Sequence, residues 1–263
     1  MKQGFVKVAS ATPRIRVADP VYNAQVICEQ AKEAAEHGAK IVVFPELCIT
    51  GYTCNDLFLQ ELLLEKAKEA LLTIAEETGQ LETLFLVGLP VDKDGRLYNV
   101  AAVLYRGRIL GMIPKKNIPM YAEFYEGRHF TPGEETVTEY RLGKQVIPFG
   151  SNLLFRCEEL PELILGCELC EDLWVAEPPS TSHALMGATV IANLSASNET
   201  VSKDDYRTLL VKASSARLLC GYIYTSAGEG ESTQDLVFGG HDLIAENGTL
   251  LAQSARFTTG ILY

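Results

Sequence analysis

Short runs made almost entirely of apolar residues recur along this chain and constrain its fold more than any other feature of the sequence. Residues 41–44 form such a run, which stops at Pro45 and Glu46. A run of this kind is typical of a strand buried on both faces of a parallel sheet, because one solvent-exposed face would make apolar and polar residues alternate. Further strands are predicted at residues 5–11, 84–89, 163–168, 188–194 and 221–226.

Helical spacing of apolar residues separates several of these strands. The expected helices span residues 21–37, 56–78 and 204–219. Gly38 ends the first helix, and Asp56 is the expected N-cap of the second. The expected hairpins pair residues 99–105 with 108–113 and residues 242–245 with 249–252, the second around Asn247 and Gly248. Strands that alternate with helices predict an α/β fold with a mixed sheet, in one domain that spans residues 1–263.

The acidic composition argues against two classes of partner. The chain has 23 Lys and Arg against 34 Asp and Glu, a formal net charge of -11, which repels phosphate backbones and anionic membranes. Residues 1–8 lack the apolar run of a signal peptide, and no stretch reaches the ~18 apolar residues of a membrane helix. The seven cysteines, an odd number, fit free thiols in a reducing compartment. We therefore expect a cytoplasmic protein with no nucleic acid and no membrane partner.

Three chemically different side chains stand where predicted strands end. Each follows its strand directly or within two residues: Glu46 after residues 41–44, Lys115 after 108–113 and Cys170 after 163–168. Sites in α/β proteins gather at such strand ends, so a carboxylate that takes a thiol proton and an ammonium that stabilises an oxyanion could meet there. Position alone equally allows a loop cap for Glu46, a solvated role for Lys115 and a buried filler role for Cys170.

Three other motifs favour structural roles. Cys167 and Cys170 have the spacing of a redox dithiol or half a zinc site, but the sequence has no second such pair and its four histidines have no ligand spacing. Residues 228–231 follow a strand as a phosphate loop does, yet the two glutamates in them would repel phosphate. His129, among aromatic residues, is expected to be a hydrogen-bonded loop residue. We therefore expect no metal and no nucleotide site, and we expect Cys167 to be a core residue.

Three motifs, read together, resemble the nitrilase superfamily, whose thiol amidohydrolases use a Glu-Lys-Cys triad in this chain order. The motifs are Val43-Phe-Pro-Glu46-Leu with Thr50-Gly-Tyr52, Ile113-Pro-Lys115, and Gly166-Cys-Glu-Leu-Cys170-Glu-Asp-Leu-Trp174. The resemblance spans nearly the whole chain. It implies an αββα sandwich, in which two mixed sheets pack face to face with helices outside. It also implies that Glu46 is the general base, Lys115 the cation that stabilises the oxyanion and Cys170 the nucleophile.

Further segments resemble one branch of that superfamily, the glutaminase domains of glutamine-dependent NAD synthetases. These segments are residues 121–133, Leu194-Ser-Ala-Ser197-Asn198 and residues 227–236. The resemblance implies that Glu126 supports the lysine and that the backbone N–H of Glu171 is a second oxyanion donor. It implies that Tyr121, Ser197 and Lys203 contact the substrate.

The implied reaction is hydrolysis of L-glutamine to L-glutamate and ammonia through a cysteine thioester. In this branch an ATP-dependent synthetase domain uses the ammonia, and the Ser-Gly-Gly-x-Asp-Ser loop of that domain is not in this sequence. We therefore expect an isolated glutaminase module that needs no cofactor, since ATP and Mg²⁺ would belong to the synthetase domain, and that forms a homo-oligomer. Two alternatives stay open: a free-standing amidase or carbamoylase acting on another amide, and a catalytically silent scaffold, which the intact triad disfavours.

Overall fold

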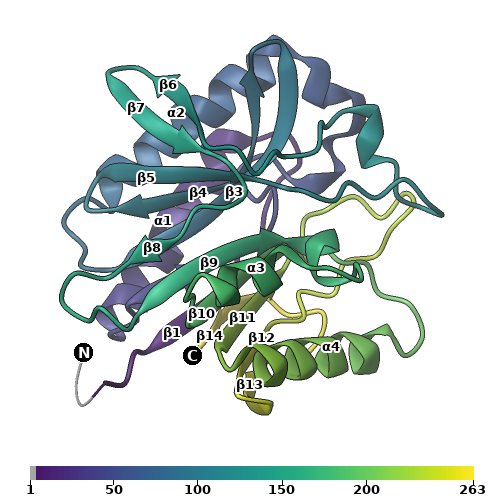
Figure 1. The fold of residues 1–263 in the computed structure, drawn as a ribbon. Helices are drawn as coiled ribbons and strands as arrows, with labels where there is room; N and C mark the ends of the chain where they lie inside the picture. The colour runs from purple at the N-terminus through teal and green to yellow at the C-terminus, as the bar shows by residue number, and fades with distance from the viewer. Residues whose placement is uncertain (1–3) are drawn as a thin grey trace.

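Two β-sheets lie face to face in the computed structural model, and helices cover the outer face of each sheet (Figure 1). The structure describes residues 4–263, so the first three residues of the opening segment 1–8 lie outside the described part. This arrangement is the αββα sandwich expected from the sequence. Across residues 4–263, no helix is both long enough and apolar enough to cross a membrane.

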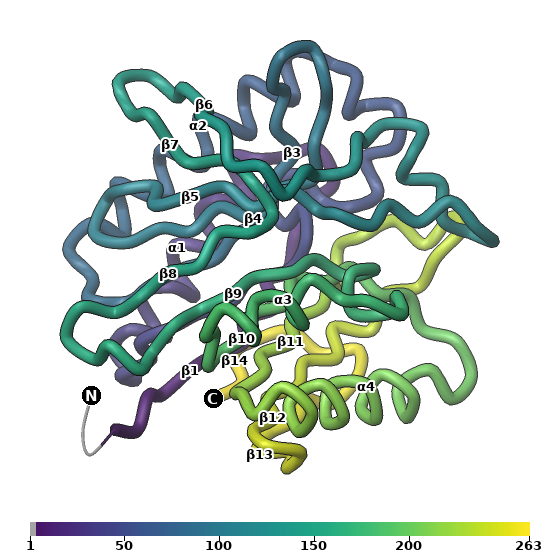
Figure 2. Tube along the Cα trace, viewed as in Figure 1, coloured from purple at the N-terminus to yellow at the C-terminus, as the bar shows by residue number. Residues whose placement is uncertain are grey.

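The first sheet has eight strands within the described residues. They are, in spatial order, β14 (Gly260–Leu262), β1 (Val8–Thr12), β2 (Ile41–Val43), β3 (Leu84–Lys93), β4 (Arg96–Tyr105), β5 (Arg108–Pro114), β7 (Gln145–Phe149) and β6 (Thr138–Leu142). Parallel pairs join β1 to β2, β2 to β3 and β5 to β7, and the other neighbours are antiparallel. β1 and β14 lie side by side although they come from opposite ends of the chain (Figure 2).

The second sheet has six strands in the same part of the chain. They are, in spatial order, β13 (Thr249–Gln253), β12 (Leu243–Glu246), β11 (Gly221–Ser226), β10 (Val190–Ser195), β9 (Ile164–Leu169) and β8 (Phe155–Arg156). β9, β10 and β11 are parallel to one another, while β8, β12 and β13 join as antiparallel strands at the edges. Asn247 and Gly248 both have a positive φ in the turn between β12 and β13, which confirms the expected hairpin.

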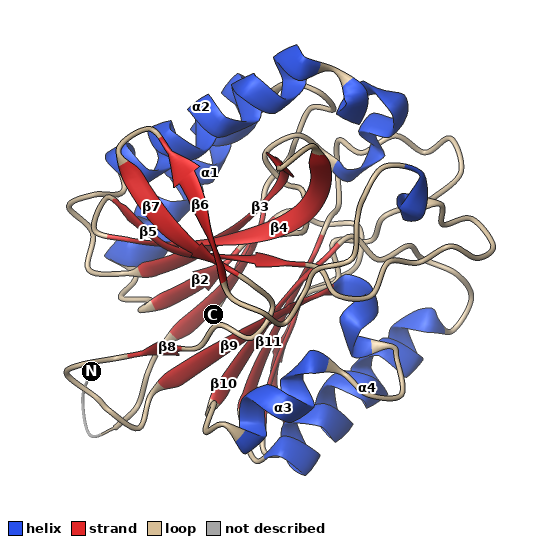
Figure 3. Cartoon of the chain, turned by 45° about the horizontal axis from the view of Figure 1, so that its top comes forward, coloured by secondary structure: helices blue, strands red, loops and turns tan. Residues whose placement is uncertain are grey.

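Two helices cover each sheet (Figure 3). α1 (Pro20–Glu36) and α2 (Glu61–Glu77) lie on the first sheet, and α3 (Pro179–Leu185) and α4 (Lys203–Leu218) lie on the second. Three 3₁₀ segments complete the described elements: η1 (Tyr52–Leu59), η2 (Glu126–Arg128) and η3 (Cys170–Leu173). α1 begins where Asp19 accepts the Tyr22 N–H ahead of Pro20, and it ends before Gly38, whose φ is +83°.

The apolar run at residues 41–44 is explained by burial on both faces of β2. Val42 packs in the core beneath α1 and α2, whereas Ile41 and Val43 pack in the core between the two sheets. Leu165, Cys167 and Leu169 of β9 close that middle core from the opposite side. The residues of β2 are buried on both faces of the strand, so the hydrophobic effect favours apolar residues at successive positions.

Most expected elements are confirmed within a few residues, but three expected boundaries are wrong. β3 continues to Lys93, four residues beyond the expected end at residue 89. α2 begins at Glu61, five residues after Asp56, because residues 56–59 belong to the 3₁₀ segment η1 and Gln60, with a ψ of 116°, has an extended backbone that separates the two helices. The Asp56 carboxylate caps no helix and instead binds Arg128 and His129. The first strand begins at Val8, where pairing with β2 starts, and the Phe5 side chain is exposed.

The elements that the sequence analysis did not predict are short or at an edge. They are α3, the β6–β7 hairpin, β8 and β14. The β6–β7 hairpin alternates buried and exposed residues, and β14 has three half-buried residues, so neither carries the continuous apolar pattern that marks the central strands.

Candidate active site

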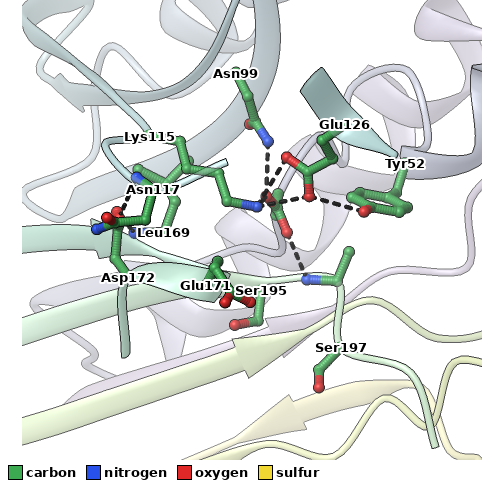
Figure 4. Close-up of polar contacts among 12 residues, drawn as sticks. Tyr52, Asn99, Lys115, Asn117, Glu126, Leu169, Glu171, Asp172, Ser195 and Ser197 are labelled. Atoms are coloured by element: carbon green, nitrogen blue, oxygen red, sulfur yellow. Dashed lines mark hydrogen bonds and ion pairs between the residues drawn. The ribbon is translucent and has the colours of Figure 1, made fainter. Parts of the chain in front are cut away.

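The ends of four strands bring the candidate residues to one edge of the sandwich. Glu46 follows β2, Lys115 follows β5, and Cys170 follows β9 as the first residue of η3. The end of β10 contacts the same place, because the Glu46 N–H binds the Ser195 carbonyl at 3.3 Å. Side chains from both sheets therefore meet where their backbones leave the strands (Figure 4).

A buried lysine lies between two buried carboxylates in this site. Lys115 Nζ is 2.6 Å from Glu46 Oε1, 2.7 Å from Glu126 Oε1 and 2.9 Å from Glu126 Oε2. Glu46 also accepts bonds from Asn99 Nδ2 at 2.7 Å and from the Ala196 N–H at 2.9 Å. The network gives each charged group hydrogen-bond partners within the protein, which is the condition for keeping charges buried.

The electrostatic balance of this cluster keeps the lysine charged and the thiol protonated. Burial alone would lower the pKa of Lys115, but the Glu126 and Glu46 carboxylates outweigh it and hold the pKa well above the usual value. Burial raises the pKa of Glu126, and Lys115 opposes that rise. Burial and Glu46 raise the pKa of the Cys170 thiol, which Lys115 offsets only in part. Nucleophilic attack by Cys170 therefore needs a base that takes the thiol proton.

The Cys170 backbone adopts an unusual conformation at the strand-to-helix turn. Its φ is +41°, in the left-handed region, and the residue is 6% exposed. The buried Asp172 carboxylate holds this turn, accepting the Leu169 N–H at 3.0 Å and both the backbone N–H and the side-chain amide of Asn117 at 2.8 Å. Burial raises the pKa of Asp172 to about 6. Asp172 thus ties the cysteine turn to the segment that follows Lys115.

The three expected substrate contacts surround the same thiol. The Tyr121 hydroxyl donates to the Glu171 carboxylate at 2.9 Å. Lys203 Nζ lies 5.1 Å from the centre of the Trp174 ring and hydrogen-bonds the side chain of Asn198. Burial lowers the pKa of Lys203, and its proximity to Cys170 opposes that shift.

Ser197 is buried one residue beyond Ala196, and its hydroxyl accepts a bond from Arg207 at 3.3 Å. The structure thus brings the other seven candidate residues to the part of the fold that holds Cys170; the roles of all eight in a reaction stay predictions.

Four residues of the site have contacts that the sequence analysis did not predict: Tyr52, Asn99, Asp172 and Arg207. Tyr52 lies in the glutamate motif and Asp172 in the cysteine motif, and Asn99 is the first residue of the predicted strand that precedes the one leading to Lys115. The sequence analysis included these three residues but did not predict which groups they contact. Arg207 is fully buried on α4 and bonds Glu199 at 2.7 Å and His241 at 2.8 Å. No local pattern marks Arg207, because its partners are in the irregular segment before α4 and at His241.

The structural roles expected for Cys167 and His129 are confirmed. Cys167 packs in the core between the sheets, and burial raises its pKa well above the usual thiol value. His129 bonds the Asp56 carboxylate at 2.9 Å and contacts the ring of Phe58. All seven cysteines are free.

Comparisons with known proteins identify the family. The family model described as carbon-nitrogen hydrolase matches residues 7–263. The glutamine-dependent NAD(+) synthetase of Mycobacterium tuberculosis is 44% identical over 260 residues, which cover 99% of this chain and 38% of that protein. The protein of the same name from Aquifex aeolicus is 31% identical over 94% of this chain and 40% of its own length. The chain thus spans about two fifths of the length of these relatives.

Solved structures agree with that result. A glutamine-dependent NAD(+) synthetase from Cytophaga hutchinsonii superposes with a TM-score of 0.88 at 29% identity and covers 98% of this chain and 42% of its own. An amidase from Nesterenkonia sp. shares the fold, with a TM-score of 0.76 at 21% identity, over all of this chain and 90% of its own. The expectation drawn from the three motifs is therefore confirmed: this chain belongs to the carbon-nitrogen hydrolase family.

Proposed function

We propose that this chain hydrolyses L-glutamine to L-glutamate and ammonia, with the thiol of Cys170 as nucleophile. The observation that carries the proposal is the buried cluster of Glu46, Lys115 and Glu126 beside that thiol. This cluster supplies a proton acceptor, Glu46, and a cation, Lys115, beside the thiol of the residue that follows β9. The relatives named glutamine-dependent NAD(+) synthetase support glutamine as the amide.

In the first half of the proposed reaction, Cys170 Sγ attacks the side-chain amide carbon while Glu46 takes the thiol proton. Glu46 Oε2 accepts one bond from Ala196, so a second lone pair can receive that proton. The carbonyl π electrons move to oxygen, where Lys115 and the Glu171 N–H stabilise the oxyanion. The C–N bond then breaks, and Glu46 gives the proton to the departing nitrogen. Ammonia is released, and the acyl group remains on Cys170 as a thioester.

In the second half, water attacks the thioester and Glu46 takes a proton from it. The tetrahedral intermediate collapses, the C–S bond breaks, and Glu46 gives its proton back to the Cys170 thiolate. The net reaction is amide plus water to acid plus ammonia. Glu126 keeps Lys115 in place throughout, because it still pairs with the lysine when Glu46 is protonated.

We further propose that an ATP-dependent synthetase domain or subunit uses the released ammonia to amidate nicotinic acid adenine dinucleotide to NAD. The relatives named NAD(+) synthetase support this, since they are more than twice as long as the matched region. Association into homo-oligomers and a cytoplasmic location stay predictions.

A substrate comparison tests the proposal. The purified chain is incubated with glutamine, with simple aliphatic amides and with N-carbamoyl amino acids, and ammonia and glutamate are measured. Glutamine is expected to give the highest kcat/KM. Faster turnover of a simple amide or a carbamoyl compound would favour the amidase or carbamoylase alternative, and no turnover of any would favour a silent scaffold.

Lys203→Ala is expected to raise KM for glutamine roughly 10- to 100-fold and to change kcat much less. The reason is that the half-buried Lys203 ammonium can pair with the α-carboxylate of glutamine, which several covalent bonds separate from the reacting amide. Steady-state kinetics measure both constants. Lys212→Ala, an exposed position on the same helix, is the control. A loss confined to kcat would contradict a binding role for Lys203.

Chelators and the removal of ATP are expected to leave glutamine hydrolysis by this chain unchanged. The proposed steps use side chains and water alone, and ATP with Mg²⁺ is assigned to the synthetase reaction. Glutamate release is measured with and without EDTA, and with and without ATP and Mg²⁺. A loss of more than a few fold on chelation would show that the mechanism lacks a component.

A further inference from the structure

The loop at residues 228–236 contacts the active site through one buried carboxylate, which the proposed mechanism does not use. Glu231 is 9% exposed. Its Oε1 accepts the Tyr52 N–H at 2.7 Å, and its Oε2 accepts the Thr53 N–H at 3.0 Å and the Thr53 hydroxyl at 2.6 Å. The Thr53 Oγ1 in turn accepts the Ser232 N–H at 2.9 Å. Four bonds thus join this loop to the start of η1.

The loop is fixed from its other side as well. The Ile15 N–H donates to the Glu229 carbonyl at 3.1 Å. Gly230 has a φ of +107°, and a Cβ there would lie 1.9 Å from the Ile15 carbonyl oxygen. Only glycine allows this close approach, so the backbone places the Glu231 side chain against Tyr52 and Thr53.

Tyr52 carries this constraint to the reacting groups. Its hydroxyl donates to Glu126 Oε1 at 2.8 Å, and Glu126 binds Lys115 through both oxygens. The Tyr52 ring also packs edge-on against Phe238 at 5.7 Å. A continuous series of contacts therefore leads from Glu231 through the Tyr52 backbone and hydroxyl to Glu126 and Lys115.

We propose that Glu231 is a positioning residue for the reaction at Cys170, and that it acts by fixing Tyr52 so that the tyrosine hydroxyl holds Glu126 against Lys115. This inference rests on the proposed function. Moving Tyr52 would leave a buried Glu126 oxygen short of one donor and loosen the lysine that stabilises the oxyanion. The substrate need not touch Glu231, so the effect falls on turnover rather than on binding.

The test compares Glu231→Gln with Glu229→Gln. Glutamine keeps the volume of Glu231 but has one acceptor oxygen, and its NH₂ group would face donors that it cannot satisfy. We expect kcat of Glu231→Gln to fall at least ~10-fold and KM to stay within ~3-fold of the value for the unmodified protein. This pattern is typical when an interaction that stabilises the transition state is lost. The Glu229 side chain is 55% exposed and pairs with Arg14 at the surface, so Glu229→Gln is expected to stay within twofold of the unmodified protein.

A double-mutant cycle tests the route through Tyr52. Tyr52→Phe removes the bond to Glu126, and adding Glu231→Gln to that variant is expected to lower kcat by less than twofold more. Independent, multiplicative losses would overturn the proposal. If Glu231→Gln does not fold, Thr53→Val removes one of the three bonds to the carboxylate and is expected to lower kcat a few fold at unchanged KM.

The outcomes separate this inference from the proposed function. An unmodified chain that releases no glutamate contradicts the proposed function. An active chain in which Glu231→Gln and Glu229→Gln have the same kcat, or in which Thr53→Val keeps full kcat, overturns the role of Glu231 alone.

Discussion

Cys170→Ala is expected to lower glutamine hydrolysis by at least ~10⁴-fold and to leave the fold intact. Without the thiol there is no covalent route, and direct attack of water on the amide, which is less reactive than a thioester, is expected to be far slower. The lost Sγ is one small atom at the end of β9, so the melting temperature is expected to change little. Glutamate release and thermal unfolding measure the two effects separately.

Cys167→Ala is the matched control for this variant. Cys167 is three residues earlier, faces the core between the sheets and has a thiol whose pKa burial raises. We expect it to keep most of the activity and to lose some stability through the cavity left in the core. An inactive Cys167→Ala beside an active Cys170→Ala would contradict the assigned nucleophile.

Lys115→Met is expected to lower kcat at least ~100-fold and to destabilise the protein by about 3–5 kcal/mol. The lysine is the cation between Glu46 and Glu126, both buried, so its removal leaves two carboxylates facing each other without compensation. Turnover and the free energy of unfolding are measured on the same preparation. Glu46→Gln keeps the shape of the general base and is also expected to cost at least ~100-fold in kcat.

Lys116→Met controls for the loss of a neighbouring charge. The Lys116 ammonium is partly exposed and pairs with Glu135 at the surface, where such pairs contribute little to stability. We expect nearly full activity and stability. Equal losses at Lys115 and Lys116 would contradict the placement of the lysine motif.

The central strands and the candidate residues at their ends could be predicted because their signals are local. Residues 41–44 are apolar at every position because both faces of β2 are buried, and Glu46 follows within two residues of that run. The same reasoning placed Lys115 and Cys170 at strand ends. Their assignment to a reaction came from the resemblance of the motifs, since position alone left ordinary roles open.

The missed features depend on contacts between distant parts of the chain. β14 exists because residues near the end of the sequence pair with β1, and the buried Arg207 bonds His241, which is 34 residues away in the sequence. Asp56 has the sequence signature of a helix cap, but Arg128 and His129 bind its carboxylate. A local sequence pattern does not show whether such a carboxylate caps a helix or binds side chains from a distant segment.

Glu231 shows how an argument against a phosphate site can leave the role of a residue unassigned. The two glutamates argue against a phosphate site in the loop at residues 228–231. In the structure the Glu229 side chain is exposed, whereas the Glu231 carboxylate accepts the backbone N–H groups of Tyr52 and Thr53 in η1. The sequence could not distinguish Glu229 from Glu231, because only the approach of Ile15 and Thr53 separates them.

The central claim is that Cys170 forms a thioester with the γ-acyl group of glutamine. The direct measurement is acid quenching during turnover of glutamine, followed by mass spectrometry with fragmentation to locate the modified residue. We predict a γ-glutamyl group on Cys170 in the unmodified chain and in Cys167→Ala, and none in Cys170→Ala. Steady glutamate release with no acyl group on Cys170, or with the group on another cysteine, would contradict the account.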